Sequence, residues 1–297
     1  MQQANQNTKP VKFGVIGGSG FYHMQGLKII REHAIDTPFG KPSDLVMEAD
    51  IAGRSVYFLP RHGRGHRFTP SEVNYRANIY ALKSLQVTHV LAVSAVGIMR
   101  EEIRPGDMVI PDQIFDRTKG IRASTFFGDG VVGHIEFADP FGAELRQLLI
   151  QAAKKVTQRV YVGGTAVCME GPAFSTRAES HQYRATLQPS VIGMTSLPEA
   201  KLAREAELCY AMLALATDYD CWNAHEGDVS VEAVLKVLKD NTQCANQIVL
   251  ELAKILPETS SCKELFAARF AIMTDRSMIP SETKKRLELL YGQYFNS

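Results

Sequence analysis

Several features that mark other classes of protein are absent from this sequence of 297 residues. No apolar run approaches the roughly 20 residues that a membrane-spanning helix needs, so we expect no membrane segment. Five cysteines stand far apart without a Cys-x-x-Cys pair, which predicts reduced thiols in a cytosolic protein and argues against a disulfide framework or a zinc site. A net charge of +1 gives no broad field that would favour nucleic acid or an anionic membrane as a partner.

The composition is that of a folded domain with a sizeable core, since 45% of the residues are hydrophobic and 22% are charged. We expect residues 1–10 to be a polar leader, because they lack the apolar stretch of a signal peptide. Residues 11–256 then form one domain. Residues 257–297 have a more broken pattern, and we expect a helical extension that packs on the core or on a neighbouring subunit.

The stretch 167–179 has the pattern of a strand, a turn and a helix start. It begins with β-branched and apolar residues, breaks at Gly171-Pro172 and resumes with hydroxyls and a carboxylate at the spacing of a helix cap. Such strand-to-helix junctions are where open α/β sheets bind ligands. Here Phe174 can stack on a flat polar ligand, Ser175 can hydrogen-bond to it and Glu170 can orient it. An ordinary connection with a buried Phe is the alternative.

Three other predicted strands end in groups that suit an anion. The strand over 11–16 ends in Gly17-Gly18-Ser19-Gly20, the strand over 55–59 is followed by Arg61-His62, and the strand over 90–93 runs into a small-residue turn that begins at Ser94-Ala95. A dinucleotide fingerprint lacks its third glycine, because His23 stands there. No Walker-type Gly-Lys-Ser/Thr occurs, which argues against a nucleoside triphosphate. A simple tight turn at Gly17–Gly20 is the alternative.

His62 and His66 are spaced like a metal-binding pair on a helix. Gly63 and Gly65 argue against a helix there, and no carboxylate completes a ligand set, so we predict no metal. Arg61 and His62 suit phosphate better, with a solvated basic loop as the alternative.

Predicted strands alternate with predicted helices over 73–85, 143–155 and 229–256. This order predicts an α/β fold: a single domain with a central mixed β-sheet flanked by helices. One buried strand over 211–216 ends in Thr217-Asp218-Tyr219-Asp220, which brings two carboxylates to a strand end.

Six motifs taken together resemble a known family. They are Gly17-Gly18-Ser19-Gly20, Arg61-His62-Gly63, Asn74-Tyr75-Arg76-Ala77-Asn78, Glu170-Gly171-Pro172-x-Phe174, Met194-Thr195-x-x-Pro198-Glu199 and Thr217-Asp218-Tyr219-Asp220-Cys221-Trp222. Over about residues 11–256 the chain is similar to the S-methyl-5′-thioadenosine phosphorylases, within the trimeric branch of the purine nucleoside phosphorylases. The resemblance implies that fold, in a cytosolic homotrimer.

The resemblance also implies the reversible phosphorolysis of methylthioadenosine to adenine and 5-methylthioribose 1-phosphate, with phosphate as co-substrate and no cofactor. Asp218 would be the catalytic acid at the purine. The other implied contacts are Ser19, Arg61, His62, Ser94, Ala95 and Thr195 to phosphate; Phe174, Met194, Tyr219 and Asp220 to the nucleoside; Ser175 and Val231 as specificity residues; and His134 and Met273 from the neighbouring subunit.

Two alternative functions follow from the same residues. A phosphorylase for 6-oxopurine nucleosides is one, although family members of that kind have Asn at the position of Asp218 and Glu at that of Ser175. The other is a nucleoside-binding regulatory protein that has lost turnover, against which the intact Arg61, His62 and Asp218 argue.

Overall fold

The computed structural model describes residues 8–18, 27–223 and 231–295, and for residues 231–234 and 236 only the backbone. The strands are β1 (Lys9–Pro10), β2 (Phe13–Gly17), β3 (Lys28–His33), β4 (Val46–Ile51), β5 (Arg54–Pro60), β6 (His89–Ile98), β7 (Met108–Ile110), β8 (Gln113–Arg117), β9 (Val160–Val162), β10 (Thr165–Met169), β11 (Val191–Gly193), β12 (Cys209–Asp218) and β13 (Thr259–Ser260). The helices are α1 (Tyr75–Ser84), α2 (Ala143–Val156), α3 (Arg177–Leu187), α4 (Ser196–Glu205), α5 (Val231–Ile255) and α6 (Ser281–Phe295), with short 3-10 turns η2 (Asp220–Trp222), η3 (Lys263–Phe266) and η4 (Arg276–Met278).

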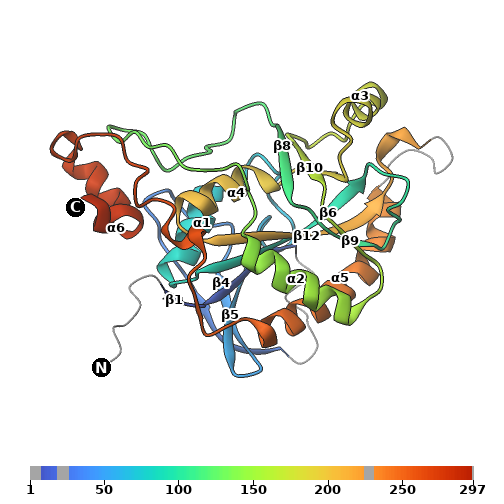
Figure 1. Ribbon diagram of the computed structural model, residues 1–297, viewed down its shortest axis with the longest axis horizontal. Coiled ribbons are helices and arrows are strands. Elements are labelled where there is room, and N and C mark those ends of the chain that lie inside the picture. Colours follow the sequence, from blue (N-terminus) through green and yellow to red (C-terminus); the bar gives the residue numbers. More distant parts are fainter. Residues whose placement is uncertain (1–7, 19–26, 224–230, 296–297) are drawn as a thin grey trace.

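A mixed sheet of eleven strands forms the centre of the molecule, as the sequence predicts. Its main path runs β3-β4-β5-β2-β6-β11-β10-β8, and β12 pairs with both β6 and β7. Strands β2, β5, β6 and β12 are parallel to one another, whereas β11 runs antiparallel to β6. Parallel strands need both faces covered. In Figure 1, α2 and α5 cover one face, and α1 and α4 lie over the other.

Apolar side chains fill both layers between the sheet and the helices. Val93 and Leu213 point toward α2 and α5 and meet Leu149 and Ile248 in one cluster. The alternate strand positions meet α1 and α4 in the other, where Leu82 and Leu202 are both 0% exposed. A side-chain period of two along β6 and β12 therefore builds both halves of the core.

The predicted helices are confirmed with small changes at their ends. The ranges 73–85, 143–155 and 229–256 correspond to Tyr75–Ser84, Ala143–Val156 and Val231–Ile255. The cap predicted before 179 is also present: Thr176 Oγ1 accepts the Glu179 N–H, and the Glu179 carboxylate accepts the Thr176 N–H at 2.8 Å.

The small-residue turn predicted at Ser94–Gly97 is wrong, because β6 continues through these residues to Ile98. Strand β2 pairs with β6 only as far as Ala92, and β11 pairs with it only at Gly97 and Ile98. Strand β12 pairs along the whole stretch and keeps it extended. On one side of β6, residues 93–96 therefore lie between the end of the pairing with β2 and the start of the pairing with β11.

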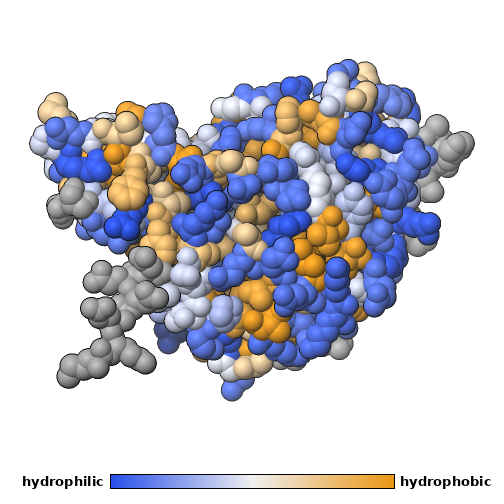
Figure 2. Space-filling model, in the orientation of Figure 1, coloured by the Kyte–Doolittle hydropathy of each residue, from blue (hydrophilic) through white to orange (hydrophobic). Residues whose placement is uncertain are grey.

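The segment after α5 returns to the body of the protein. Strand β13 pairs with β1, and α6 buries Leu287, Leu290 and Tyr291 in the core beside α1. Figure 2 shows a largely hydrophilic surface on the face drawn, with hydrophobic side chains gathered around β9 and α2. Within the described ranges, no helix combines the length and apolarity that a membrane crossing requires.

Candidate active site

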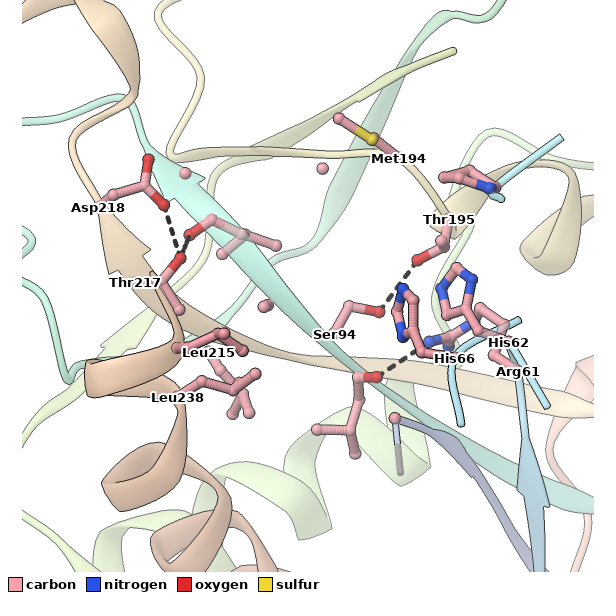
Figure 3. Close-up of a pocket in the computed structure, with 18 of the residues that line it drawn as sticks. Arg61, His62, His66, Ser94, Met194, Thr195, Leu215, Thr217, Asp218 and Leu238 are labelled. Carbon is pink, nitrogen blue, oxygen red and sulfur yellow. Dashed lines mark hydrogen bonds between the residues drawn. The ribbon is translucent and has the colours of Figure 1, made fainter. Parts of the chain in front are cut away.

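A cavity of about 810 Å³ opens where β6 loses one partner, at the carboxyl ends of the parallel strands. This volume lies within the range of small-molecule sites. Figure 3 shows Arg61, His62, His66, Ser94 and Thr195 together at one end of the cavity and Thr217 and Asp218 at the other. Met194 lies at the edge between the two groups. Most of the predicted strand-end groups therefore meet in one place.

Two hydroxyls and a helix start form the first end of the cavity. Ser94 Oγ lies 3.1 Å from Thr195 Oγ1, and Thr195 precedes α4 without using its hydroxyl to cap that helix. Ala95, although in the middle of a central strand, is exposed to the cavity. Leu197 has non-helical φ and ψ, so the regular turns of α4 begin after it, and the two hydroxyls are the donors here that suit an anion.

Arg61 lies at this end but is used differently from the prediction. Its side chain is only 2% exposed, and its Nε and Nη2 bind the two Glu199 oxygens at 2.7 and 2.9 Å. Nη1 and Nη2 also donate to the carbonyl oxygens of Val93 and Ile16. A bidentate grip on phosphate is therefore wrong, because the fork holds Glu199. One of the five guanidinium N–H groups is left for a ligand.

His62 lies beside Arg61 and stacks on His66 with ring centroids 4.3 Å apart. Burial, together with the neighbouring Arg61 charge, lowers the pKa of His62 to about 4. The ring is therefore neutral at pH 7. Its Nδ1 donates to the Phe68 carbonyl oxygen at 2.8 Å, which leaves a lone pair on Nε2. Such a nitrogen accepts a hydrogen bond from a protonated phosphate oxygen.

A β-bulge builds the second end of the cavity. Ala216 pairs with Val96 and Asp218 with Gly97, so Thr217 is the extra residue of β12. Asn241 of α5 donates to the Ala216 carbonyl oxygen at 2.9 Å and holds the bulge. Bulges re-aim side chains at sites of this kind. Here the bulge turns Thr217 and Asp218 toward the cavity (Figure 3).

The Thr217 hydroxyl lies between Asp218 and a backbone carbonyl oxygen. Its Oγ1 lies 2.7 Å from Asp218 Oδ2 and 3.0 Å from the Val96 carbonyl oxygen, but a hydroxyl has one proton. Since the carbonyl oxygen only accepts, both contacts are satisfied when Asp218 is protonated and donates to Thr217. Burial raises the pKa of Asp218, which favours the same state. A hydroxyl donating to Asp218 would lower that pKa, but the Val96 carbonyl competes for its proton.

Asp220 completes this end as a second buried carboxylate. Its backbone N–H donates to Asp218 Oδ1 at 2.9 Å and fixes the direction of that side chain. Burial and the neighbouring Asp218 both raise the pKa of Asp220. The two carboxyl groups therefore favour neutral forms over a pair of like charges.

The wall between the two ends contains Phe174 and Met194, as predicted. Phe174 keeps 47% of its surface exposed. Gly171 has a φ of +69°, and a Cβ there would lie 2.4 Å from Met194 Sδ, so only glycine fits. The buried Arg122 donates to the Met194 carbonyl oxygen and fixes the residue from below.

Glu170 does not orient a ligand, contrary to the interpretation from sequence. It is 6% exposed and is held by Arg122 Nε at 2.7 Å, Ser71 Oγ at 2.6 Å and the Lys119 N–H at 2.5 Å. Its role is to fix the loop after β8 beneath the cavity wall.

The remaining candidates lie at several places. Ser19 is outside the described residues, and Val231 begins α5 with its side chain outside them. Ser175 is 9% exposed behind the wall, and Tyr219 packs edge-on against Trp222. Neither is among the residues that line the cavity. His134 and Met273 lie together on the surface, away from this chain's own cavity.

Residues that were not singled out from the sequence also line the cavity. They include Arg67, Lys239 and Asn246. Arg67 and Lys239 add positive charge that Arg61, paired with Glu199, does not supply. No local motif marks these residues, because α5 and the loop after β5 reach the cavity only in the folded chain.

The chain was compared with known proteins. A profile of the phosphorylase superfamily matches residues 12–254. S-methyl-5′-thioadenosine phosphorylase of Geobacter sulfurreducens is 56% identical over 95% of this chain and 98% of that protein. A crystal structure of methylthioadenosine phosphorylase from an antarctic soil metagenomic library has a TM-score of 0.88 and 46% identity, over 95% of this chain and 99% of that one. Methylthioadenosine phosphorylase from Schistosoma mansoni, in complex with adenine, has a TM-score of 0.78 and 40% identity, over 82% and 91% of the chains.

Proposed function

This chain belongs to the phosphorylase superfamily, in the family of S-methyl-5′-thioadenosine phosphorylases, and we propose that it cleaves methylthioadenosine with inorganic phosphate. The products are adenine and 5-methylthioribose 1-phosphate. No organic cofactor takes part. The predicted cytosolic location stays a prediction.

The arrangement of the cavity carries the proposal. Hydroxyl donors lie at one end and a carboxyl group whose pKa is raised by burial lies at the other, with Met194 between them (Figure 3). Cleavage of a glycosidic bond needs a nucleophile on one side of the sugar and an acid at the leaving group on the other. One cavity holds groups suited to both.

The chemistry follows from these two ends. Phosphate held near Ser94 and Thr195 attacks the anomeric carbon while the bond to the purine nitrogen breaks, and the configuration there inverts. The sugar becomes cation-like in the transition state, which the phosphate charge stabilises. Asp218 gives its proton to N7 of the purine, and the base leaves neutral. Phosphate itself is the nucleophile, so no covalent enzyme intermediate forms.

Asp218 also favours a 6-aminopurine over a 6-oxopurine. With N7 protonated, adenine presents two donors side by side, and the carboxylate that remains accepts both. A 6-oxopurine presents one donor and one acceptor there, which an Asn amide pairs with and a carboxylate does not. In this proposal Phe174 packs against the base, Met194 against the ribose, and Asp220 supports Asp218, while Ser175, Tyr219 and Val231 act around the base and the 5′ group.

We further propose a homotrimer in which a neighbour completes each cavity. Met273 and Phe270 are 68% and 84% exposed, and the Met273 N–H donates to the carbonyl oxygen of the exposed Val132. The His134 N–H donates to Ala271 from the adjoining segment. These two segments thus present apolar side chains and an imidazole on one surface. They suit a role over the methylthio group of a neighbour's substrate.

The experiment is to incubate the protein with methylthioadenosine, with and without phosphate, and to follow adenine release and ³¹P NMR. The proposal predicts one sugar phosphate formed for each adenine and no release without phosphate. Release without phosphate would make the protein a hydrolase. Tight binding without turnover would support the regulatory alternative, and faster cleavage of inosine would support the 6-oxopurine alternative.

A further inference from the structure

A second group of chemically active side chains lies at the opposite end of the central strands. His89 begins β6, Cys209 begins β12, and the two residues are paired across the sheet. Cys262 lies just after β13. The ligand atoms of these three residues are all within 4.8 Å of one another. The cavity begins several residues further along both strands, so this cluster does not belong to the active site.

Hydrogen bonds fix the tautomer of His89. Thr88 Oγ1 accepts the Lys12 N–H at 2.9 Å, and its proton faces the carbonyl oxygens of Pro10 and Lys12 at 3.2 and 3.3 Å. Those oxygens only accept, so when the hydroxyl donates to one of them, His89 Nδ1, 3.0 Å from Oγ1, is the donor to Oγ1. Nε2 of the neutral ring therefore carries a lone pair. This is the arrangement in which a histidine binds metal through Nε2.

Among the residues that the structure describes, the Cys262 thiol is the neighbour that can share a proton with the His89 ring. His89 is 0% exposed, and its Nε2 is a buried atom that no well-aligned hydrogen bond satisfies. Nε2 lies 3.5 Å from Glu144 Oε1. This oxygen atom is also buried and without a hydrogen bond, although the Glu144 side chain as a whole is 34% exposed. An unpaired buried nitrogen costs free energy unless a ligand occupies it.

The ligand types identify the kind of ion. Two thiols and an imidazole are the ligand set of a thiophilic ion such as Zn²⁺. A tetrahedral zinc site places its ligand atoms about 3.3 to 3.8 Å apart. The three ligand atoms here lie within 4.8 Å of one another, so a bound ion would draw them closer together. All the cysteines in the structure are free thiols.

We propose that His89, Cys209 and Cys262 bind one zinc ion. The site joins the starts of β6 and β12 to the segment that follows β13. That segment leads into η3, where Leu265 is fully buried. The proposed role of the zinc ion is structural, because it holds the chain after α5 against the core. The sequence analysis argued against a zinc site because the cysteines are far apart along the chain, whereas the fold brings Cys209 and Cys262 together beside His89.

The experiment uses the full chain, purified without metal and with its thiols reduced. One equivalent of Zn²⁺ is added, and bound metal is measured after desalting. We expect one zinc per chain and a melting temperature raised by about 5 °C. When cobalt replaces zinc in the wild-type chain, its absorption spectrum should show sulfur-to-metal charge transfer and the bands of a tetrahedral site. This measurement needs no variant.

Cys262→Ser is the test variant and Cys244→Ser, on α5, is its control. Cys262→Ser should lower zinc affinity at least a hundredfold and abolish the thermal shift, whereas Cys244→Ser should change neither. Both should keep the rate of phosphorolysis. No retained zinc, cobalt spectra without thiolate ligation, equal binding by both variants, or a Cys209–Cys262 disulfide in place of metal binding would each overturn the proposal.

Discussion

At the scale of single residues, Thr217 decides what Asp218 can do. Its one hydroxyl proton lies within reach of both the Val96 carbonyl oxygen and Asp218 Oδ2, and when Asp218 is protonated the hydroxyl can donate to Val96 and accept from Asp218. Burial raises the pKa of Asp218 above that of an exposed aspartic acid. Because its pKa is raised, the protonated form persists to higher pH and is lost as pH rises through that pKa.

Thr217→Val removes the acceptor while keeping the shape of the side chain. We expect kcat/KM for methylthioadenosine to fall about tenfold, the equivalent of one buried hydrogen bond. The alkaline limb of its pH profile should move to lower pH, because the protonated acid loses its partner. Thr217→Ser should restore both. An alkaline limb that stays in place, or moves to higher pH, would show that Thr217 donates to Asp218 instead.

Sequence alone identified Asp218 but not its partner. The carboxylate stands in a motif, whereas the role of Thr217 depends on a bulge that only the pairing of β12 with β6 creates. For Arg61, the sequence predicted the location of the residue but not its binding partner. Its place at the cavity was predicted, but its fork was assigned to phosphate because Glu199, on a distant helix, could not be placed beside it.

At the scale of elements, the cavity results from an exchange of partners along β6. Along β6, pairing with β2 stops at Ala92 and pairing with β11 starts at Gly97, and Arg61, just after β5, donates to the Val93 carbonyl oxygen in the gap. Glu199 of α4 holds Arg61 and also accepts a hydrogen bond from Tyr210 of β12 at 2.9 Å. This buried pair thereby joins α4 to the strands around the cavity.

Arg61→Met should destabilise the fold by about 3–5 kcal/mol, because Glu199 is left as an unpaired buried charge. Adding Glu199→Gln should recover part of that loss, since the remaining group is neutral. Chemical denaturation at one fixed protein concentration measures both variants. If the double variant is less stable than Arg61→Met, the loss of stability in Arg61→Met does not come from an unpaired charge on Glu199.

Helices were easier to predict than strand ends. The ends of α2 and the cap of α3 follow from local periodicity and capping residues, which act within one or two turns. The end of β6 depends on which strands lie beside it. Ser94 to Gly97 read as a turn because small residues follow an apolar run, but pairing with β12 keeps them extended.

At the scale of the whole molecule, the surface around Met273 exposes apolar side chains that no contact within a single chain accounts for among the described residues. Val132, Phe270 and Met273 are all more than half exposed. Apolar side chains gathered in this way mark association surfaces. If a neighbouring subunit packs on this surface, His134 and Met273 of this chain lie at the cavity of that neighbour, in keeping with the proposed trimer.

Met273→Asp should therefore reduce the trimer measured by light scattering and lower kcat/KM for methylthioadenosine at least tenfold, since a charge is placed in an apolar contact. Ile30→Asp, on the edge strand β3, is the matched control and should leave both unchanged. A wild-type protein that is a monomer with full activity would refute the shared site.

The central claim is that Asp218 donates a proton to, and selects, a 6-aminopurine. The most direct measurement is the ratio of kcat/KM for methylthioadenosine to that for methylthioinosine, in the wild type and in Asp218→Asn. We predict a wild-type ratio of about ten to a hundred or more, from the roughly 1–3 kcal/mol cost of an unpaired buried group, and a collapse of that ratio in the variant. A wild-type preference for methylthioinosine, or a ratio that the substitution leaves unchanged, would contradict the account.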